Sequence, residues 1–324
     1  MIETLTQTFA AVQGWLFETA VQPLVFHLEL MAYVEEAHEA VGTVMIGVIE
    51  IVVLYALLKP LEAWRPVEQW PDKKAVRSDV IYTWLHRLGV LPLLIFLLLV
   101  IPVTELDAWL RMNDMVRANI EDVIPGIARN GLAAFVIFVI LIDLVEYAMH
   151  RLQHRFNWWW ALHSLHHSQR QMSFWTDDRN HLLDDVLTSA AVAVAALALG
   201  VPSSQFVMIV IATRMIESLS HVNARVDFGR LGNRLLVSPA FHRRHHAIGA
   251  GHEGQYQGVN FATLFPFWDM LFRTADFTPG LQPTGIRDQL AGRDYGIGFW
   301  RQQVLGFRRL KDALLGRSEQ PGVG

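Results

Sequence analysis

Long apolar stretches separated by charged segments run through the first half of the chain. Residues 40–58, 88–103 and 131–149 are almost wholly apolar, and Glu50 is the single charge in the first of them. A helix needs about 20 apolar residues to cross the hydrocarbon core of a bilayer. We therefore predict three transmembrane helices here, the second of them lengthened by the residues that precede it.

Two shorter apolar runs follow, at residues 186–201 and 205–217, with Pro202 and two serines between them. Proline and serine favour a turn between helices, so we predict a helical hairpin, which need not cross the membrane completely. Residues 5–34 are apolar but interrupted by Gln, Glu and Pro23. This segment is expected either to lie in the membrane interface or to form an extra short helix.

The segment 299–316 near the C-terminus has apolar residues close to helical spacing, interleaved with arginine and lysine. Two interpretations fit this pattern: an amphipathic helix on an anionic membrane surface, or a surface helix packed on its own domain. The pattern is formed by Trp300, Val304, Phe307 and Leu314, together with Arg301, Arg308, Arg309 and Lys311.

The composition supports a membrane protein. Hydrophobic residues make up 52% of the 324 and charged residues only 18%, whereas soluble domains carry about a quarter. The net charge of -4 is too small to imply a nucleic-acid partner. No cysteine is present, which excludes disulfides, thiolate-ligated haem and Cys-bound iron–sulfur clusters. Any metal must therefore be held by nitrogen and oxygen. The first 58 residues contain no Lys or Arg, so the basic region of a secretory signal is not seen.

Charge asymmetry orients the predicted helices. Basic residues follow the first span, the third span and the hairpin, whereas the loop between the second and third spans is more acidic. Basic loops mark the cytoplasmic side of a membrane. Three crossings and one hairpin bring every basic segment to that side. We therefore expect an all-α helical bundle in a bacterial inner membrane, with a histidine-rich di-metal cap on the cytoplasmic face.

Histidine is concentrated in one part of the chain. Eleven of the fourteen histidines lie between His150 and His252, and neutral imidazole is a good ligand for zinc, copper, iron and nickel. Residues three or four apart share a helix face. The i+3 and i+4 histidines of each HxxHH triplet diverge around the helix, which suits two metals. Eight imidazoles also exceed what one tetrahedral site can use. The clusters are His150 with His154; His163 with His166 and His167; and His242 with His245 and His246.

Four other polar residues belong to this prediction. Asp143 and Glu146 precede His150 by seven and four residues, on the same helix face, and a carboxylate inside a span is usually functional or paired. Asp143 is expected to accept a hydrogen bond from a ligand imidazole or to pair with an arginine; the alternative is a structural ion pair. His181 and His221 stand at the two ends of the hairpin. They are candidate ligands, the alternative being ordinary core histidines.

These motifs resemble the fatty acid hydroxylase/sterol desaturase superfamily over roughly residues 135–275. Leu182 stands where the family often has Pro, and Arg273 stands where it has Gly. The matching elements are Asp143-x₃-Tyr147-x₂-His150-Arg151-x₂-His154, His163-x₂-His166-His167, Arg179-x-His181, His221-x-Asn223, Pro239-x₂-His242-Arg-x-His245-His246 and Phe267-Trp268-Asp269-Met-Leu-Phe-Arg273-Thr274.

The resemblance implies an integral-membrane enzyme with a histidine-ligated di-iron centre. Such an enzyme uses O₂ and an external electron donor to hydroxylate or desaturate a C–H bond of a lipid. The resemblance divides the chain into N-terminal membrane helices (1–130), a catalytic domain (131–275) and a C-terminal amphipathic segment with a tail (276–324). The expected iron ligands are His150, His154, His163, His166, His167, His181, His221, His242, His245 and His246, and the expected catalytic residues are Asp143, Glu146, Arg179 and Asn223.

Several alternatives stay open at this stage. The electron donor must be a separate reductase, ferredoxin or cytochrome, because no cysteine cluster and no nucleotide-binding glycine motif is seen. Desaturation or C–C cleavage is possible in place of hydroxylation. Fatty acyl chains, sterols or hopanoids, carotenoids, ether lipids and aminolipids all remain candidate substrates. A metal transporter is the rival from another class, but its ligands should lie near the bilayer midplane on broken helices.

Overall fold

The computed structural model describes residues 2–70, 72–113, 115, 123–252, 254 and 257–317. Within these residues the chain is helical, with no strand and one isolated bridge between Ala247 and Thr284, which confirms the predicted all-α class. Four short helices are η1 (Phe17–Val21), η2 (Met31–Tyr33), η3 (Ile127–Arg129) and η4 (Arg287–Ala291). The α-helices are α1 (Ile2–Leu16), α2 (Gln22–His27), α3 (Val34–Trp64), α4 (Lys74–Arg87), α5 (Val90–Met112), α7 (Gly131–Arg155), α8 (Asn157–His167), α9 (Leu182–Leu199), α10 (Ser203–Ser220), α11 (Gly229–Leu235), α12 (Pro239–His245), α13 (Phe267–Phe272) and α14 (Phe299–Leu314).

Four helices of the described chain are long and apolar enough to cross a membrane. Two of the predicted spans, 40–58 and 131–149, lie inside α3 and α7. The third, 88–103, corresponds to α5, but the expectation that the preceding residues lengthen it is wrong: Gly89, with a φ of 80°, separates α4 from α5, and α5 continues to Met112 instead. The fourth of these helices is α9, which we expected to be one arm of a hairpin and too short on its own. It has 18 residues because it begins at Leu182, with Asp184 buried in its first turn.

The predicted hairpin is formed by α9 and α10. Gly200 ends α9 with a positive φ of 67°, a conformation that glycine adopts at little cost. Pro202 then precedes α10 in an extended conformation. Gly200 and Pro202 thus form the turn between the two helices, and the predicted hairpin is confirmed.

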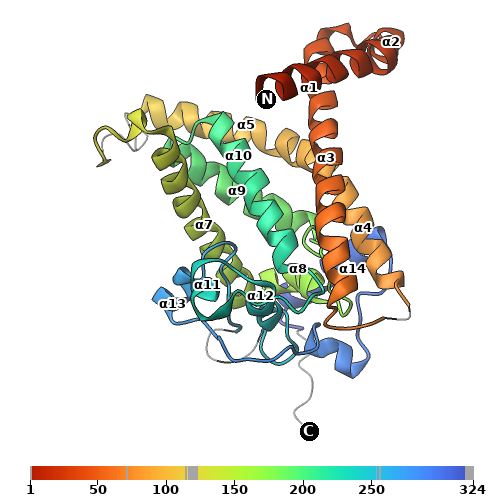
Figure 1. Ribbon diagram of the computed structural model, residues 1–324, viewed down its shortest axis with the longest axis vertical. Helices are drawn as coiled ribbons and strands as arrows, with labels where there is room; N and C mark the ends of the chain where they lie inside the picture. Colours follow the sequence, from red (N-terminus) through yellow and green to blue (C-terminus); the bar gives the residue numbers. More distant parts are fainter. Residues whose placement is uncertain are drawn as a thin grey trace.

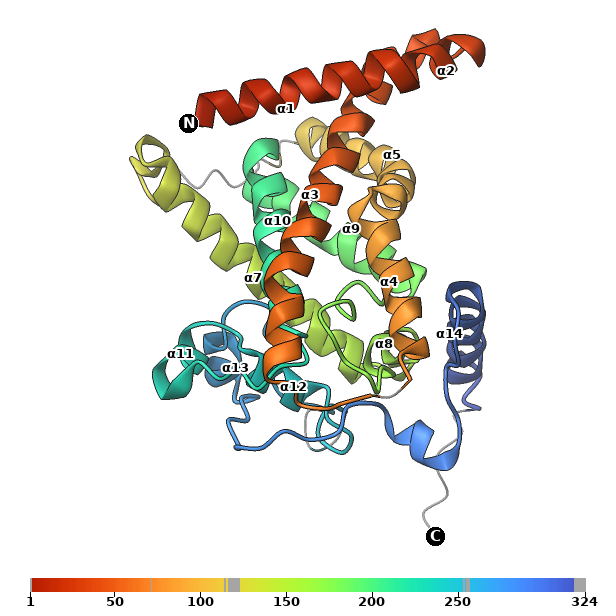
Figure 2. The same cartoon turned by 45° about the vertical axis from the view of Figure 1, so that its right-hand side comes forward.

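The N-terminal helices α1 and α2 lie across one end of α3 (Figure 2). Residues 5–34 thus form helices of their own, crosswise to the long helices of the bundle. The side chains of Leu5, Trp15, Leu24 and Phe26 are exposed here, each by more than half. This crosswise arrangement is the one expected of helices that lie in a membrane interface.

Helices α3 and α4 approach closely at Gly47, where an added Cβ would lie 1.7 Å from the carbonyl oxygen of Arg87. No residue with a side chain fits at this position without moving the helices apart. The close approach brings Glu50 of α3 against the Arg87 guanidinium, with 3.1 Å between Oε2 and Nη1. The single charge of the first predicted span is therefore paired inside the protein.

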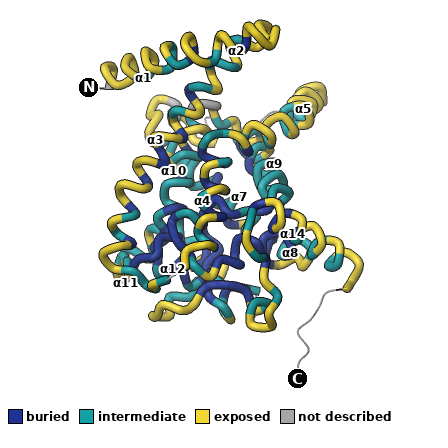
Figure 3. Tube along the Cα trace, turned by 90° about the vertical axis from the view of Figure 1, so that its right-hand side faces the viewer, coloured by how far each residue is buried: buried dark blue, intermediate teal, exposed yellow. Residues whose placement is uncertain are grey.

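The short helices α8, α11, α12 and α13 gather at the end of the bundle opposite α1 and α2 (Figure 1). Figure 3 shows that buried chain is concentrated at this end, whereas the outer surfaces of the long helices are exposed. Helix α14 packs against α8 and α4, with Gly306 directly against the His181 ring. The interpretation as a helix packed on its own domain is therefore confirmed, and Phe307 also contacts the His181 ring. Trp300 remains exposed, and the contact of α14 with a membrane surface stays a prediction.

Candidate metal centre

Three helical segments carry the clustered histidines, and local sequence explains where each begins and ends. Asn130 caps the start of α7 by accepting from the Ala133 amide at 3.1 Å, as Asn often does. Phe156 is extended and separates α7 from α8 by one residue. At α12, the Ser238 hydroxyl accepts from the Phe241 amide and Pro239 occupies the first turn, which is a favourable start for a helix.

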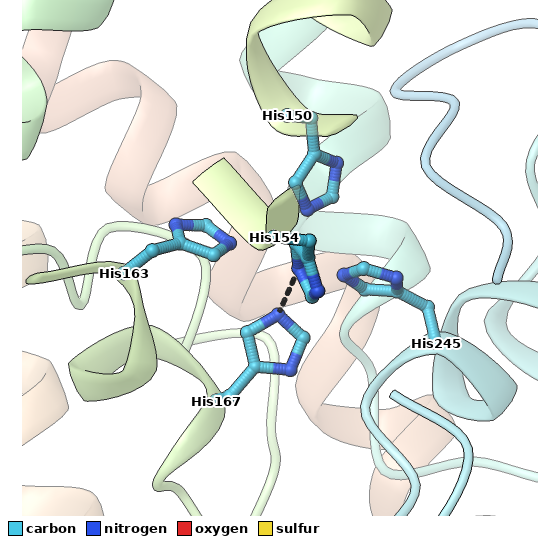
Figure 4. Close-up of side chains that lie close together, drawn as sticks. All are labelled: His150, His154, His163, His167 and His245. Carbon is cyan, nitrogen blue, oxygen red and sulfur yellow. Dashed lines mark hydrogen bonds between the residues drawn. The ribbon is translucent and has the colours of Figure 1, made fainter. Parts of the chain in front are cut away.

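The imidazoles converge in two groups. In the first, five ligand nitrogens from α7, α8 and α12 all lie within 4.8 Å of one another (Figure 4). In the second, four ligand nitrogens from α8, α12 and the end of α10 meet the same limit. The first group is His150, His154, His163, His167 and His245, and the second is His166, His221, His242 and His246.

Helical geometry explains how the clusters divide. Histidines four apart stay together: His163 and His167 belong to the first group, whereas His242 and His246 belong to the second. The remaining histidine of each triplet turns to the other group, as the predicted divergence of i+3 and i+4 positions requires. Each HxxHH triplet therefore contributes to both groups.

The Nε2 atoms face one another at distances that suit a shared ion. His221 Nε2 lies 3.2 Å from that of His166 and 3.0 Å from that of His242. In the other group, 3.1 Å separates Nε2 of His154 from Nε2 of His167. Two nitrogens bound to one ion at about 2.1 Å lie about 3.0 Å apart at a right angle and about 3.4 Å apart in a tetrahedron.

Unpartnered nitrogens give a second test of the fit. The Nε2 atoms of His150, His163 and His245 are buried and have no hydrogen-bond partner within the protein. Leaving a buried polar atom unpaired costs about 1–3 kcal/mol. The donor set of neutral imidazoles suits iron, zinc or copper, so the residues present fit one metal ion in each group.

The opposite ring nitrogens hold several of these imidazoles in place. Nδ1 of His150 lies 2.8 Å from the Phe261 carbonyl oxygen, and Nδ1 of His245 lies 2.7 Å from that of Val259. His221 makes the equivalent contact with the carbonyl oxygen of Glu217, at 2.8 Å. A ring that donates from Nδ1 presents the lone pair of Nε2. These backbone contacts therefore orient both groups toward their centres.

Burial keeps the imidazoles neutral. It lowers the pKa of His166, His167, His242, His245 and His246 well below the ordinary value, and the neighbouring imidazoles lower these pKa values further. Burial also lowers the pKa of His221 to about 4. All six rings are therefore uncharged near pH 7, which is the form that binds a metal ion.

The structure does not bring His181 to either group. Its Nδ1 accepts from the Leu183 amide at 3.1 Å, and its Nε2 lies 3.0 Å from the Gln303 carbonyl oxygen. With both nitrogens engaged, no lone pair is left for a metal ion. We therefore leave His181 out of the proposed ligands and assign it to the start of α9 and its contact with α14.

Three of the four expected catalytic residues make structural contacts instead. Asp143 accepts from the Leu264 amide and from Trp268 rather than from an imidazole or an arginine. Arg179 pairs with Asp79 at 2.8 Å and donates to the last turn of α8. Asn223 exchanges hydrogen bonds with the backbone of Glu68. We assign these residues positioning roles.

Glu146 differs from these three because it lines a cavity beside the metal centre. The cavity has a volume of about 140 Å³ and is bounded by α7, α8, α9, α10 and α12. Glu146 Oε2 is buried without a hydrogen-bond partner, and Glu217 of α10 lines the same cavity. Imidazoles of both groups form part of its wall: His150 and His163 from the first, and His166, His221 and His242 from the second.

Sequence reasoning missed the role of Asp184. Its carboxylate accepts from His163 Nδ1 at 3.0 Å, from Trp159 at 2.7 Å and from Gln153 at 2.8 Å. A carboxylate behind a ligand imidazole fixes its tautomer and orientation. An acidic residue in the first turn of a helix usually indicates only a favourable helix start, so the sequence offered no distinguishing signal.

Replacing Asp184 with asparagine is expected to weaken metal binding by about 10–100-fold. The carboxylate accepts from His163 with one oxygen and from Trp159 and Gln153 with the other, whereas an amide has only one accepting oxygen for these donors. Metal retained after dialysis against a graded chelator series measures the effect. Asp185→Asn is the matched control, since the Asp185 carboxylate lies against His86, which belongs to neither group. Equal retention by the two variants would contradict the assigned role.

Comparison with known families and proteins adds an independent finding. Residues 135–274 match the family model of fatty acid hydroxylases, and this range contains every histidine of both groups. Ornithine lipid hydroxylase OlsE from Rhizobium tropici is 28% identical over 151 residues, which are 47% of this chain and 44% of that protein. Alkylglycerol monooxygenase from Caenorhabditis elegans is 27% identical over 132 residues, which are 41% of this chain and 25% of that protein.

The matched region thus covers less than half the length of either relative. No solved structure matches the chain. The four apolar helices make the chain an integral membrane protein. Its residues 135–274 carry the two histidine groups and are similar to the fatty acid hydroxylase family.

Proposed function

We propose that this protein is an O₂-dependent di-iron oxidoreductase that hydroxylates a C–H bond of a membrane lipid. The observation that carries the proposal is the convergence of nine imidazoles in two adjoining groups beside one cavity. The match to the fatty acid hydroxylase family supports the same reaction class. Desaturation of the same lipid is the closest alternative outcome.

The proposed iron ligands are the five histidines of the first group and the four of the second. Two irons bound there would supply the redox chemistry with O₂ that attack on an aliphatic C–H bond requires, which acid–base groups alone cannot provide. The protein holds the imidazoles neutral and aims their Nε2 atoms inward through Nδ1 contacts. Burial of the site excludes water from both groups.

The cavity is the proposed place for the reacting part of the lipid. Its wall contains imidazoles from both groups, so a bound segment faces both proposed irons. Gln153, Thr188 and Thr263 add polar positions that can orient the substrate. At about 140 Å³ the cavity holds only a short segment of a lipid, and the rest must lie outside it.

The charge of the cavity narrows the substrate class. Glu146 and Glu217 line it, and no Lys or Arg does so within the described chain. An anionic lipid group would find no cationic side chain in this wall, whereas an ammonium group can pair with a carboxyl group that ionises beside it. A lipid with an amine near the reacting position therefore fits better than an acidic one. The similarity to an ornithine lipid hydroxylase supports an aminolipid, and the similarity to alkylglycerol monooxygenase keeps an ether lipid as the second candidate.

Electrons must come from a separate reductase, ferredoxin or cytochrome, because a chain without cysteine has no ligands for a sulfur-bound cluster of its own. We propose that the donor approaches from the cytoplasmic face of a bacterial inner membrane. The basic segments around the metal centre support that orientation. A transporter is disfavoured, because the histidines lie toward helix ends rather than on broken helices at mid-membrane.

The purified protein in lipid nanodiscs, reduced by a chemical donor under ¹⁸O₂, is expected to convert an ornithine-type aminolipid to a product heavier by one ¹⁸O atom. Lipid mass spectrometry detects the product, and a loss of two hydrogens would indicate desaturation instead. The ether lipid alkylglycerol is supplied in parallel. Faster turnover of the alkylglycerol would contradict the aminolipid assignment, and no change in either lipid with both irons bound would contradict hydroxylation of these lipid classes.

A further inference from the structure

The segment of residues 264–273, which includes α13, lies against the middle of a membrane-spanning helix. Asp143 is the central residue of α7, with twelve residues on either side, or about 18 Å of helix in each direction. Its carboxylate accepts from the Leu264 amide at 2.8 Å, the Phe265 amide at 3.2 Å and the Trp268 indole at 3.0 Å. The segment is therefore fixed at the depth of the interior of α7.

One turn further along α7, a second set of contacts holds the other end of the segment. The rings of Tyr147 and Phe272 are stacked with 5.3 Å between centroids. The Tyr147 hydroxyl lies 2.9 Å from Thr274 Oγ1. The chain thus rises to the level of Asp143 and returns past Tyr147, so it covers one side of the helix without crossing the membrane.

The backbone of this region is satisfied in the way that a hydrocarbon environment demands. Asp269 accepts from the amides of Phe261 and Ala262, each at 2.8 Å, while Asp143 accepts from those of Leu264 and Phe265. Non-helical backbone at membrane depth is tolerated only when its polar groups find partners inside the protein. Two buried carboxylates thus accept hydrogen bonds from four of the five backbone amides between residues 261 and 265.

The outer face of α13 is apolar, and much of it is left uncovered by the described chain, although one side of the Phe272 ring packs on Tyr147. Leu271 is 64% exposed, and Met270 and Phe272 are 38% and 40% exposed. Arg273 follows in a left-handed conformation and is itself exposed. A basic residue at the end of an apolar segment can extend its charge toward the membrane surface.

We propose that residues 264–273 form a re-entrant wedge whose outer face (Met270, Leu271 and the exposed side of Phe272) is immersed in the acyl chains of the bilayer. The occupant of this face is lipid rather than a second protein, because the wedge is attached at the level of Asp143 on a helix that itself faces lipid. The preceding residues Ala262 and Thr263 line the cavity beside the metal centre. The wedge therefore directly follows a part of the cavity wall in the chain.

The absence of cysteine allows a direct measurement of depth. A nitroxide spin label is attached to Leu271→Cys in the full protein, reconstituted in phosphatidylethanolamine and phosphatidylglycerol vesicles. Collision with O₂, which dissolves in lipid, is compared with collision with a water-soluble nickel chelate. Leu98→Cys on α5, 61% exposed, serves as the lipid reference, and Leu290→Cys in η4, 67% exposed among charged neighbours, serves as the water reference.

The ratio of O₂ to nickel collisions at Leu271 is expected to match that at Leu98 and to exceed that at Leu290 several-fold. A ratio equal to that at Leu290 overturns the proposal, and protection from both reagents overturns it as well, since a protein partner would then cover the face. Leu271→Glu is also expected to lower the yield of folded protein in membranes, whereas Leu290→Glu leaves the yield unchanged. None of these readouts depends on catalysis.

Discussion

Replacing His245 with alanine is expected to lower activity at least about 100-fold, since loss of a mere supporting contact to a metal ligand already costs 10–100-fold. His245 is fully buried, and its Nε2 faces the first group without another partner. The variant should lose metal from that group and keep it in the second, so iron should fall from about two to about one per chain. Elemental analysis and oxygenated-lipid yield measure the two effects.

His166→Ala is the counterpart in the second group and should remove the other iron. His181→Asn is the matched control, because the sequence also predicted His181 as a ligand, but both of its ring nitrogens form hydrogen bonds outside the metal centre. Asparagine can still cap the start of α9. This control should retain both irons. The two-group arrangement is contradicted if His181→Asn loses an iron, or if His245→Ala and His166→Ala each lose both.

The helices and the histidine clusters could be predicted because their signals are local. Apolar runs long enough to span a bilayer identified α3, α5 and α7, and i, i+4 spacing identified the imidazoles that share a helix face. The difference between His181 and His221 could not be predicted, since both stand at ends of the hairpin. Only the packing of α14, with Gly306 against the His181 ring, turns that imidazole away from the metal centre.

Ion pairs and hydrogen bonds between residues far apart in the sequence could not be predicted either. Arg87 counted toward the basic residues that orient the chain, yet its side chain is fully buried. Its carboxylate partners Asp177 and Asp178 lie 90 and 91 residues away. The charge of a residue is visible in a sequence, but the burial that decides its role depends on tertiary contacts. Asp143 likewise turned out to support a backbone segment 121 residues further along.

Replacing Arg87 with leucine is expected to destabilise the protein by about 3–5 kcal/mol, because it leaves buried carboxylates without their counter-charge. The guanidinium contacts Glu50 at 3.1 Å, Asp177 at 2.8 Å and Asp178 at 3.0 Å, and donates to Ser218 at 3.0 Å. Burial alone would lower the pKa of Arg87, but the three carboxylates outweigh it and raise the pKa above its usual value. Arg87 thus joins α3, α4, α10 and the segment after α8.

This network adjoins the cavity through Asp177, so its loss should also loosen the wall of the metal centre. Denaturant unfolding in detergent micelles, followed by tryptophan fluorescence, measures the change in stability. Arg214→Leu is the matched control: Arg214 lies 3.7 Å from the same Asp178 but is 22% exposed, so about 1 kcal/mol is expected. Adding Glu50→Gln and Asp178→Asn to the Arg87→Leu variant should restore part of the lost stability, because fewer buried charges then lack a partner. No recovery would indicate that Arg87 stabilises the fold by packing rather than by charge.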